Sequence, residues 1–295
     1  MSDLTSLRLA VVQCALAGAR QDNHTRLEGH LRAAAGAGAQ VVLLPELFDG
    51  PYFPQWEDEG SFALAAPLAD AAAVQRFCAL ASELGVVLPI SFFERAGPHH
   101  YNSVAMVDAD GDVLGVYRKA HIPAGPGYQE KFFFRPGDTG FRVWQTQMGP
   151  IGVGICWDQW FPEAARAMML QGAELLLYPT AIGSEPQDPT LDTRSAWQRA
   201  MQGHAVCNAV PIAAANRCGR EGDIHFYGHS FICDGSGEFL VQMDAEQEGF
   251  VVVEIDLAAH RRQRAAFGFF RDRRPDLYGL LSQADAVPAA CRTAG

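Results

Sequence analysis

The sequence predicts an α/β protein made of two similar halves. Short apolar runs rich in Val, Ile and Leu alternate with longer Ala-rich stretches along the chain, a pattern typical of strands that are each followed by a helix. The order strand, helix, strand, helix, strand and hairpin occurs twice. A structural duplication is the natural interpretation, in which each sheet carries helices on one face and needs a partner for the other.

The length and composition are those of a globular protein with a substantial core. Of the 295 residues, 48% are hydrophobic and 19% are charged, and a domain of this size removes roughly three quarters of its unfolded surface from water. It therefore needs neither disulfides nor a metal for stability. We expect a single domain over residues 1–295, with the segment from about residue 257 as a C-terminal tail.

The first half begins with a strand and a helix. The run at 9–13 predicts the strand, and Asn23 is the expected N-cap of a helix that reaches about residue 37. Asp108, Asp110 and Gly111 tolerate positive φ and so predict the turn of a hairpin. The other elements expected in this half are a strand at 40–45, a helix at 70–84, a strand at 86–94 and the hairpin itself at 103–119.

The second half repeats this order. It begins with a strand at 151–156, and Pro162 predicts the first turn of the next helix. A further strand at 251–256 follows the repeat. Between them we expect a helix at 161–171, a strand at 173–179, a helix at 192–208, a strand at 210–216 and a hairpin at 230–243.

Charge and cysteine content exclude several classes of protein. The net charge of −11 argues against a nucleic-acid partner and favours small cationic substrates. The chain shows neither a signal-peptide pattern nor an apolar run of membrane-spanning length, so we expect a cytoplasmic protein with no membrane partner. The cysteines form no C-x-x-C pair, which fits neither a disulfide framework nor a zinc ribbon; they lie at positions 14, 78, 156, 207, 218, 233 and 291.

Three ionisable residues lie at the ends of predicted strands, where open α/β sheets place their sites. Glu46 follows VVLLP, Lys119 ends VLGVYRK and Cys156 ends IGVGIC. A thiolate attacks carbonyl carbon, a buried carboxylate can act as a general base, and an ammonium can stabilise an oxyanion. Each residue taken singly also fits a structural role, but the three would converge if the halves pack face to face.

These residues occur in blocks that resemble the nitrilase superfamily of carbon–nitrogen hydrolases. The similarity runs from about Leu7 to Tyr278, and its accessory blocks are most similar to the members that hydrolyse N-carbamoylputrescine. The catalytic blocks are LLPELF at 43–48, YRKAHIP at 117–123 and GICWDQWFPE at 154–163. The accessory blocks are PGYQEKFFFRPGDTGF at 126–141, GAELLLYPTAIGSEPQDP at 172–189, WQRAMQGHA at 197–205 and AAFGFFRDRRPDLY at 265–278.

The resemblance implies a four-layer αββα sandwich and hydrolysis without a metal or a cofactor. Cys156 would be the nucleophile, Glu46 the general base and Lys119 the group that stabilises the oxyanion. Glu130, in the GYQEK block, matches a family glutamate that positions the lysine or the substrate. The backbone N–H of Trp157 could complete the oxyanion hole.

The implied substrate is a small ureido compound with a cationic end, and its hydrolysis to putrescine, carbon dioxide and ammonia would belong to polyamine synthesis. A carboxylate or an aromatic face can hold an ammonium group. Glu185 is therefore a candidate for this role, with Asp188 as the alternative. Tyr52 and Trp157 are candidate walls of the substrate pocket.

Two other functions also fit the sequence. One is another amidase of the superfamily, acting on N-carbamoyl-β-alanine or an N-carbamoyl amino acid; such a substrate calls for Arg or Lys, and the segment 181–192 contains neither. The other is a non-catalytic interaction protein with the same fold. Retention of all four polar residues, Glu46, Lys119, Glu130 and Cys156, argues against it.

Further expectations concern two histidines, the run at 267–278 and Cys291. Gly228 and the hairpin context argue against a metal site at His225 and His229. The resemblance suggests a homo-oligomer, and the aromatic, arginine-rich run at 267–278 has an interface-like composition; a tail packed on its own subunit is the alternative. Cys291 could be exposed and open to oxidation.

Overall fold

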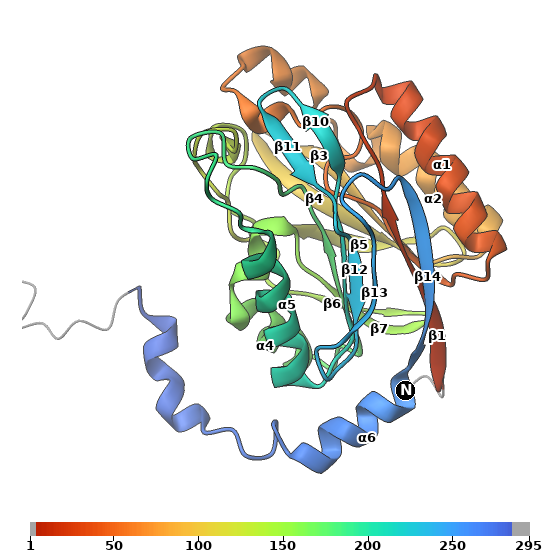
Figure 1. The fold of residues 1–295 in the computed structure, drawn as a ribbon, viewed down its shortest axis with the longest axis vertical. Helices are drawn as coiled ribbons and strands as arrows, with labels where there is room; N and C mark the ends of the chain where they lie inside the picture. The colour runs from red at the N-terminus through yellow and green to blue at the C-terminus, as the bar shows by residue number, and fades with distance from the viewer. Residues whose placement is uncertain (1–3, 285–295) are drawn as a thin grey trace, which may run out of the picture.

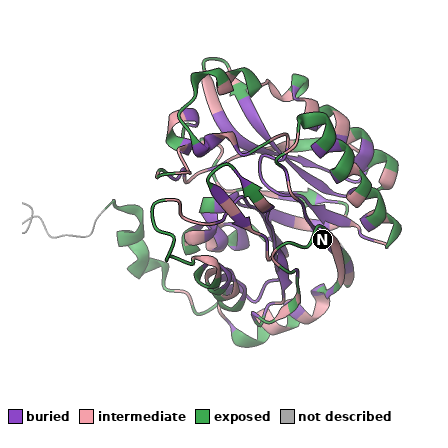
Figure 2. Cartoon of the chain, turned by 45° about the horizontal axis from the view of Figure 1, so that its top comes forward, coloured by how far each residue is buried: buried purple, intermediate pink, exposed green. Residues whose placement is uncertain are grey.

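The computed structural model describes residues 4–284, in which two sheets pack face to face and helices cover both outer sides (Figure 1). This is the four-layer αββα arrangement that the resemblance implies. The helices expose one side to solvent and bury the other against a sheet (Figure 2). Cys291 lies outside the described residues.

The first sheet contains the strands of the first half and the last strand of the chain. β1 pairs in parallel with β2 and antiparallel with β14, and a bridge between Val41 and Val87 links this group to the antiparallel strands β3, β4 and β5. Its outer face is covered by α1 and α2 (Figure 1). The elements are β1 (Ser6–Gln13), α1 (Arg20–Gly36), β2 (Val41–Leu43), α2 (Ala72–Leu84), β3 (Leu88–Ala96), β4 (His99–Val107), β5 (Val113–Arg118) and β14 (Gly249–Asp256).

The second sheet repeats this plan and confirms the predicted duplication. Its order is β13-β12-β9-β8-β7-β6, with β7, β8 and β9 parallel and a hairpin at one edge. Helices α4 and α5 cover its outer face. The elements are β6 (Val143–Thr146), β7 (Gly149–Val153), α4 (Pro162–Leu170), β8 (Leu175–Pro179), α5 (Arg194–Asn208), β9 (Ile212–Ala215), β12 (Phe231–Cys233) and β13 (Phe239–Gln242).

Side chains alternate between the two faces of each strand and so contribute to different layers of the core. In β1, Leu9 and Val11 face the core between the sheets, while Ala10 and Val12 face α1 and α2. In β8, Leu177 points into the same central core. Because successive strand residues point to opposite faces, a strand buried on both sides reads as one continuous apolar run.

The expectation that Asn23 caps the first helix is wrong. The helix begins earlier, at Arg20, and its N-cap is Ala19, which makes no side-chain cap. Asn23 is instead buried inside the helix, and its Nδ2 donates to the carbonyl oxygens of Leu16 at 2.9 Å and Gly18 at 3.2 Å. The Asn23 amide therefore binds carbonyl groups of the loop before the helix and does not cap the free N–H groups of the first turn.

Several short elements lie outside the predicted repeat. Strands β6, β10 (Cys218–Glu221) and β11 (Ile224–Tyr227) were not expected, because each has only four residues and no long apolar run. The short helix α3 (Glu130–Phe133) lies between the two halves of the chain. The 3₁₀ turns are η1 (Phe53–Gln55), η2 (Glu59–Leu64), η3 (Leu68–Asp70), η4 (Cys156–Trp160) and η5 (Pro275–Ser282).

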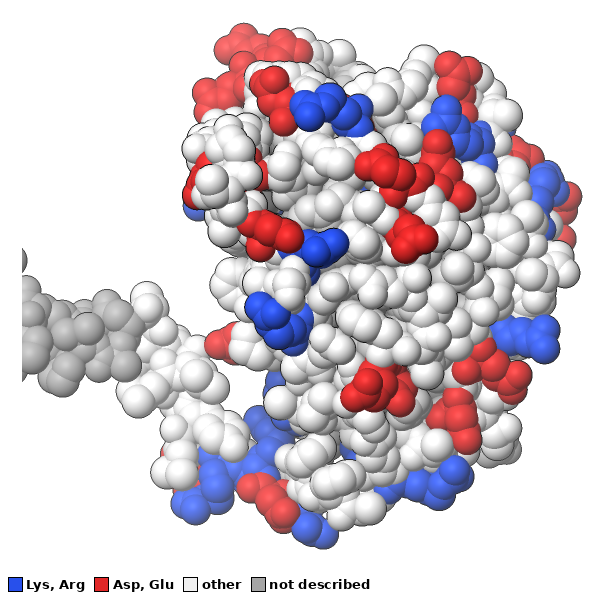
Figure 3. Space-filling view, viewed as in Figure 1, with Lys and Arg blue, Asp and Glu red and all other residues white. Residues whose placement is uncertain are grey.

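The C-terminal segment begins with α6 (Leu257–Phe267), capped by the Asp256 side chain, and continues to η5. It runs around the outside of the second half (Figure 1), and Lys and Arg side chains gather on it (Figure 3). None of the helices within residues 4–284 is both long and apolar enough to cross a membrane.

Replacing Leu177 with alanine should destabilise the fold strongly. Its side chain is completely buried between the sheets, so the variant loses apolar contacts and leaves a cavity, at a cost of about 2–5 kcal/mol. Urea unfolding measures this loss. Leu240→Ala, at a position 42% exposed on β13, is the control; equal losses in both variants would contradict the central core described here.

Candidate active site

Four of the predicted polar residues come together where strands of both sheets end. Glu46 follows β2, Lys119 directly follows β5, Cys156 follows β7 and opens η4, and Glu130 opens α3. Glu46, Lys119 and Glu130 have no exposed surface, and Cys156 is 6% exposed. The backbone N–H of Glu46 donates to the carbonyl of Thr180 at 3.3 Å, which ties the first half to the end of β8.

Lys119 lies between two carboxylates. Its Nζ is 2.8 Å from Glu46 Oε1 and 2.9 and 2.7 Å from the two oxygens of Glu130. Burial alone would lower the pKa of Lys119, but the charges of Glu130 and Glu46 raise it above its ordinary value. The ammonium form is therefore the one this site holds.

Glu46 has the properties of a buried base. Burial raises its pKa, while Lys119 lowers it in part. Oε1 accepts from Asn102 Nδ2 at 2.6 Å as well as from Lys119. Oε2 is buried and accepts no hydrogen bond from the residues described, so one oxygen is left to exchange a proton with a neighbouring group.

Cys156 occupies a strained turn between β7 and η4. Its φ is +41°, a region that residues other than glycine rarely adopt and that occurs often at functional sites. Sγ donates to the carbonyl of Ala181 at 3.6 Å. Burial raises the pKa of Cys156, and the charge of Glu46 raises it further, so the resting group is a thiol beside a carboxylate.

Asp158 holds this turn in place. Its Oδ2 accepts from the Ile155 N–H at 2.9 Å and from the Tyr117 hydroxyl at 2.8 Å. Its Oδ1 accepts from the His121 N–H at 3.0 Å and lies 2.7 Å from His121 Nδ1. A fully buried carboxylate with this many donors fixes the backbone next to Cys156.

A cavity of about 350 Å³ opens onto the thiol. Cys156 and Glu130 lie in its wall, and so do two predicted substrate residues, Glu185 and Trp157. The remaining lining residues are Pro123, Ala124, Gly125, Tyr128, Trp160, Ala181, Ile182, Gln187, Leu191 and Thr193.

Two of the predicted pocket residues are placed elsewhere. Tyr52 is completely buried and lies behind Glu130, to whose Oε1 its hydroxyl donates at 2.6 Å. It is not among the residues that line the cavity. Asp188 is also absent from the lining, and its Oδ1 accepts from the N–H and hydroxyl of Thr190 at 3.0 and 2.6 Å.

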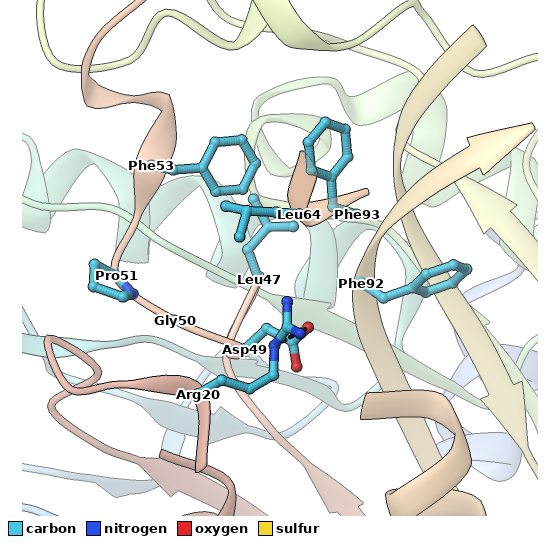
Figure 4. A pocket seen from close by; sticks show the side chains of 9 residues that line it. All are labelled: Arg20, Leu47, Asp49, Gly50, Pro51, Phe53, Leu64, Phe92 and Phe93. Carbon is cyan, nitrogen blue, oxygen red and sulfur yellow. Dashed lines mark ion pairs between the residues drawn. The ribbon is translucent and has the colours of Figure 1, made fainter. Parts of the chain in front are cut away.

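Another cavity, of about 220 Å³, lies beside the loop that follows Glu46 (Figure 4). Leu47, Phe53, Leu64 and Phe93 form part of its apolar wall. None of the four clustered polar residues lines it, so it is separate from the thiol.

The family model for carbon–nitrogen hydrolases matches residues 8–265. The chain belongs to this family. It is 54% identical over 271 residues to an N-carbamoylputrescine amidase of Arabidopsis thaliana, a match that covers 89% of this hydrolase and 91% of the relative. It is also 47% identical over 279 residues to a citrullinase of Francisella tularensis, with 93% and 98% of the chains covered.

Solved structures of the family resemble this hydrolase throughout. A carbon–nitrogen hydrolase from Helicobacter pylori G27 has a TM-score of 0.90 at 38% identity and covers 95% of this chain and 99% of its own. A point mutant of the amidase from Nesterenkonia sp. AN1 has a TM-score of 0.78 at 27% identity, with 92% and 95% covered. That structure carries an acetamide moiety covalently attached to its active-site cysteine.

Residues outside the predicted set support the cluster of this hydrolase. Asn102 faces Lys119 across the β4–β5 pair, because the Lys119 N–H donates to its carbonyl at 2.8 Å. The predicted hairpin register could have indicated Asn102. Asp158 and Tyr128 could not be found in this way, because their hydrogen-bond partners Tyr117 and Gly183 are distant in sequence. The Tyr128 hydroxyl accepts from the Gly183 N–H at 3.0 Å and thus orders one wall of the cavity.

The histidines that were considered as metal ligands have other partners. His225 Nε2 is 2.6 Å from Glu246 Oε1, and His229 Nε2 is 3.0 Å from Arg194 Nη1. An arginine beside His229 repels a cation, which disfavours a metal site there.

Replacing Asp158 with asparagine should loosen the turn at Cys156. The variant keeps the shape of the side chain but replaces an acceptor oxygen with a donor, which leaves buried groups unpaired at a cost of about 1–3 kcal/mol. Urea unfolding gives the stability change. Asp188→Asn, in an exposed loop, should cost far less, and an unchanged stability in Asp158→Asn would refute the role given to this carboxylate.

Proposed function

We infer that this protein hydrolyses N-carbamoylputrescine to putrescine, carbon dioxide and ammonia. The observation that carries this conclusion is the cavity whose wall contains the Cys156 thiol, Glu130 and the Glu185 carboxylate. The buried Lys119 ammonium binds Glu130 and also Glu46. The extensive identity to N-carbamoylputrescine amidases supports the same substrate.

In the first step, Cys156 Sγ attacks the ureido carbonyl and its proton passes to Glu46. Coupling the attack to proton transfer avoids a free thiolate, which burial and the carboxylates disfavour. The developing oxyanion is stabilised by the Lys119 ammonium and the Trp157 backbone N–H. Collapse breaks the bond to the terminal nitrogen, which leaves as ammonia with the proton returned by Glu46.

In the second step, water hydrolyses the thioester. Glu46, again a carboxylate, accepts a proton from water as the water attacks the thioester carbonyl. The tetrahedral species expels Cys156, and the proton returns to the sulfur. The released carbamate then decomposes to carbon dioxide and putrescine. A covalent adduct on the active-site cysteine of the Nesterenkonia amidase supports a cysteine nucleophile.

The pocket suits the cationic end of this substrate. Glu185 lines the cavity together with Trp157 and Trp160, whose rings form an edge-to-face pair with centroids 6.3 Å apart. A carboxylate and aromatic rings are the groups that hold an ammonium ion. Glu185 therefore holds the terminal amine and fixes the distance from it to the ureido carbon.

A citrulline-like substrate is the second candidate because a citrullinase is among the relatives. Citrulline carries a carboxylate in addition to an amine. The described residues that line the cavity include neither Arg nor Lys, so a carboxylate would have no cationic partner there. The same reasoning disfavours N-carbamoyl-β-alanine and other N-carbamoyl amino acids.

Ammonia release from parallel reactions with N-carbamoylputrescine, citrulline and N-carbamoyl-β-alanine tests the proposal. We expect a clear preference for the first substrate and loss of activity in Cys156→Ser, with an unchanged circular dichroism spectrum. Preference for a carboxylate substrate would overturn the substrate assignment. Full activity in the serine variant would overturn the nucleophile.

Replacing Glu185 with glutamine should weaken use of the amine substrate selectively. Loss of a charge-assisted contact should reduce kcat/KM for N-carbamoylputrescine about tenfold or more, while N-butylurea, which lacks the ammonium, should react as with wild type. Asp188→Asn is the matched control and should leave both rates unchanged. Equal losses of Glu185→Gln on both substrates would assign the ammonium to another residue.

We also propose that the chain is a single cytoplasmic domain that forms a homo-oligomer through its C-terminal segment. The central core shared by both sheets supports one domain, and the free thiols of the described cysteines fit a reducing compartment. A groove of about 980 Å³ lies between α4, α5 and the C-terminal segment. It exposes Leu170, Phe267 and Leu281, and a second copy is the occupant proposed for it.

Light scattering coupled to gel filtration tests this assembly. Wild type should elute as an oligomer, and the double variant Phe267→Asp/Leu281→Asp should shift to a lower mass because it places charge in the apolar contact. A monomeric wild type, or an oligomer that both substitutions leave intact, would contradict the proposed interface.

A further inference from the structure

The β10–β11 hairpin extends the β9–β12 pair beyond the six-stranded sheet. It lies between β9 and β12 in the chain, and Phe226 of β11 forms a bridge with Gly183. It carries Glu221, and Arg217 lies directly before it. Both side chains are buried and neither contacts the substrate cavity, so they have no role in the chemistry described above.

Arg217 connects this hairpin to the loop that follows the base. Its Nη1 donates to Glu221 Oε1 at 2.8 Å and Oε2 at 2.7 Å. Its Nη2 donates to the carbonyl oxygens of Leu47 and Gly50, each at 2.8 Å. The planar guanidinium thus fastens two points of the loop, which a lysine ammonium on a single flexible stem could not do with the same geometry.

Glu221 continues the connection to the catalytic lysine. Its Oε2 accepts from the Tyr52 N–H at 2.7 Å. The Tyr52 hydroxyl in turn donates to Glu130 Oε1 at 2.6 Å, and Glu130 binds Lys119. The hairpin is therefore linked to the ammonium through the Tyr52 backbone, its side chain and Glu130.

The loop needs such support because it starts in a strained conformation. Leu47, next to Glu46, has a φ of +46°, which costs energy for a residue with a side chain. Its N–H donates to Ser91 Oγ at 2.9 Å. Farther along, Asp49 lies 3.4 Å from Arg20 (Figure 4). Its Oδ1 also contacts His24 Nε2.

We propose that the buried Arg217–Glu221 pair is a positioning element for catalysis, which holds the loop at 47–52 so that Glu46 and Glu130 both meet Lys119. This inference rests on the proposed function for its kinetic readout. A buried ion pair is a weak source of net stability, but it fixes geometry because breaking it leaves a charge without a partner.

The first test compares Arg217→Lys and Glu221→Gln with wild type in the hydrolysis of N-carbamoylputrescine. Because small displacements of catalytic groups are costly, kcat should fall about tenfold or more with little change in KM. The acid limb of the kcat profile should move to higher pH, since a looser contact with Lys119 raises the pKa of Glu46. Glu221→Gln keeps an acceptor for Tyr52 and remains informative if Arg217→Lys does not fold.

A double-mutant cycle with Tyr52→Phe tests the route of the effect. If Glu221 acts through Tyr52, the losses in kcat of the single variants should not add in Glu221→Gln/Tyr52→Phe. Arg261→Met, which removes the ion pair of Arg261 with Glu174 on the outer surface, is the control and should lower the melting temperature without changing kcat. Additive losses in the cycle would overturn the proposed route.

The rate at which iodoacetamide alkylates Cys156, followed by intact mass across pH, is a readout that needs no substrate. The positioning variants should shift this pH profile relative to wild type, whereas Arg261→Met should not. An inactive wild type with shifted alkylation in the variants would refute the substrate and keep the positioning role. Folded variants with wild-type kcat and alkylation profiles would overturn the positioning role.

Discussion

The placement of one buried ammonium between two carboxylates governs the rest of the site. Lys119 has no exposed surface, and its contacts with Glu46 and Glu130 are all within 2.9 Å. Taking these charges out of water is costly unless they remain paired. The surrounding structure must therefore hold all three together, because displacing one carboxylate removes one of the two partners of Lys119, and displacing Lys119 leaves two buried carboxylates without it.

The duplicated fold supplies this geometry. Glu46 and Lys119 come from strand ends of the first half, and Cys156 comes from the corresponding end of the second. The central apolar core holds the two sheets face to face. The thiol therefore lies near Glu46, Lys119 and Glu130 only in the folded molecule. The raised pKa values of Glu46 and Cys156 share burial as their largest cause, which keeps the proton on sulfur until a carbonyl is present.

The features that could be predicted from the sequence are those that leave a pattern among neighbouring residues. Glu46, Lys119 and Cys156 each end an apolar strand, and the repeated order of elements indicated the duplication. The contacts of Tyr52 with Glu130 and of Arg217 with the Leu47 and Gly50 carbonyls could not be predicted, because they join residues far apart in the chain. Such contacts depend on how loops pack after the sheets have formed, which periodicity and propensity do not report.

Rapid acid quenching of the enzyme during turnover of N-carbamoylputrescine, followed by peptide mass spectrometry, tests the central claim most directly. In the proposed mechanism, the buried Glu46, Lys119 and Glu130 support both the formation and the hydrolysis of a thioester on Cys156. We expect a peptide containing Cys156 whose mass has increased by that of the substrate less ammonia. Turnover with no adduct on Cys156, or with an adduct on another residue, would contradict it.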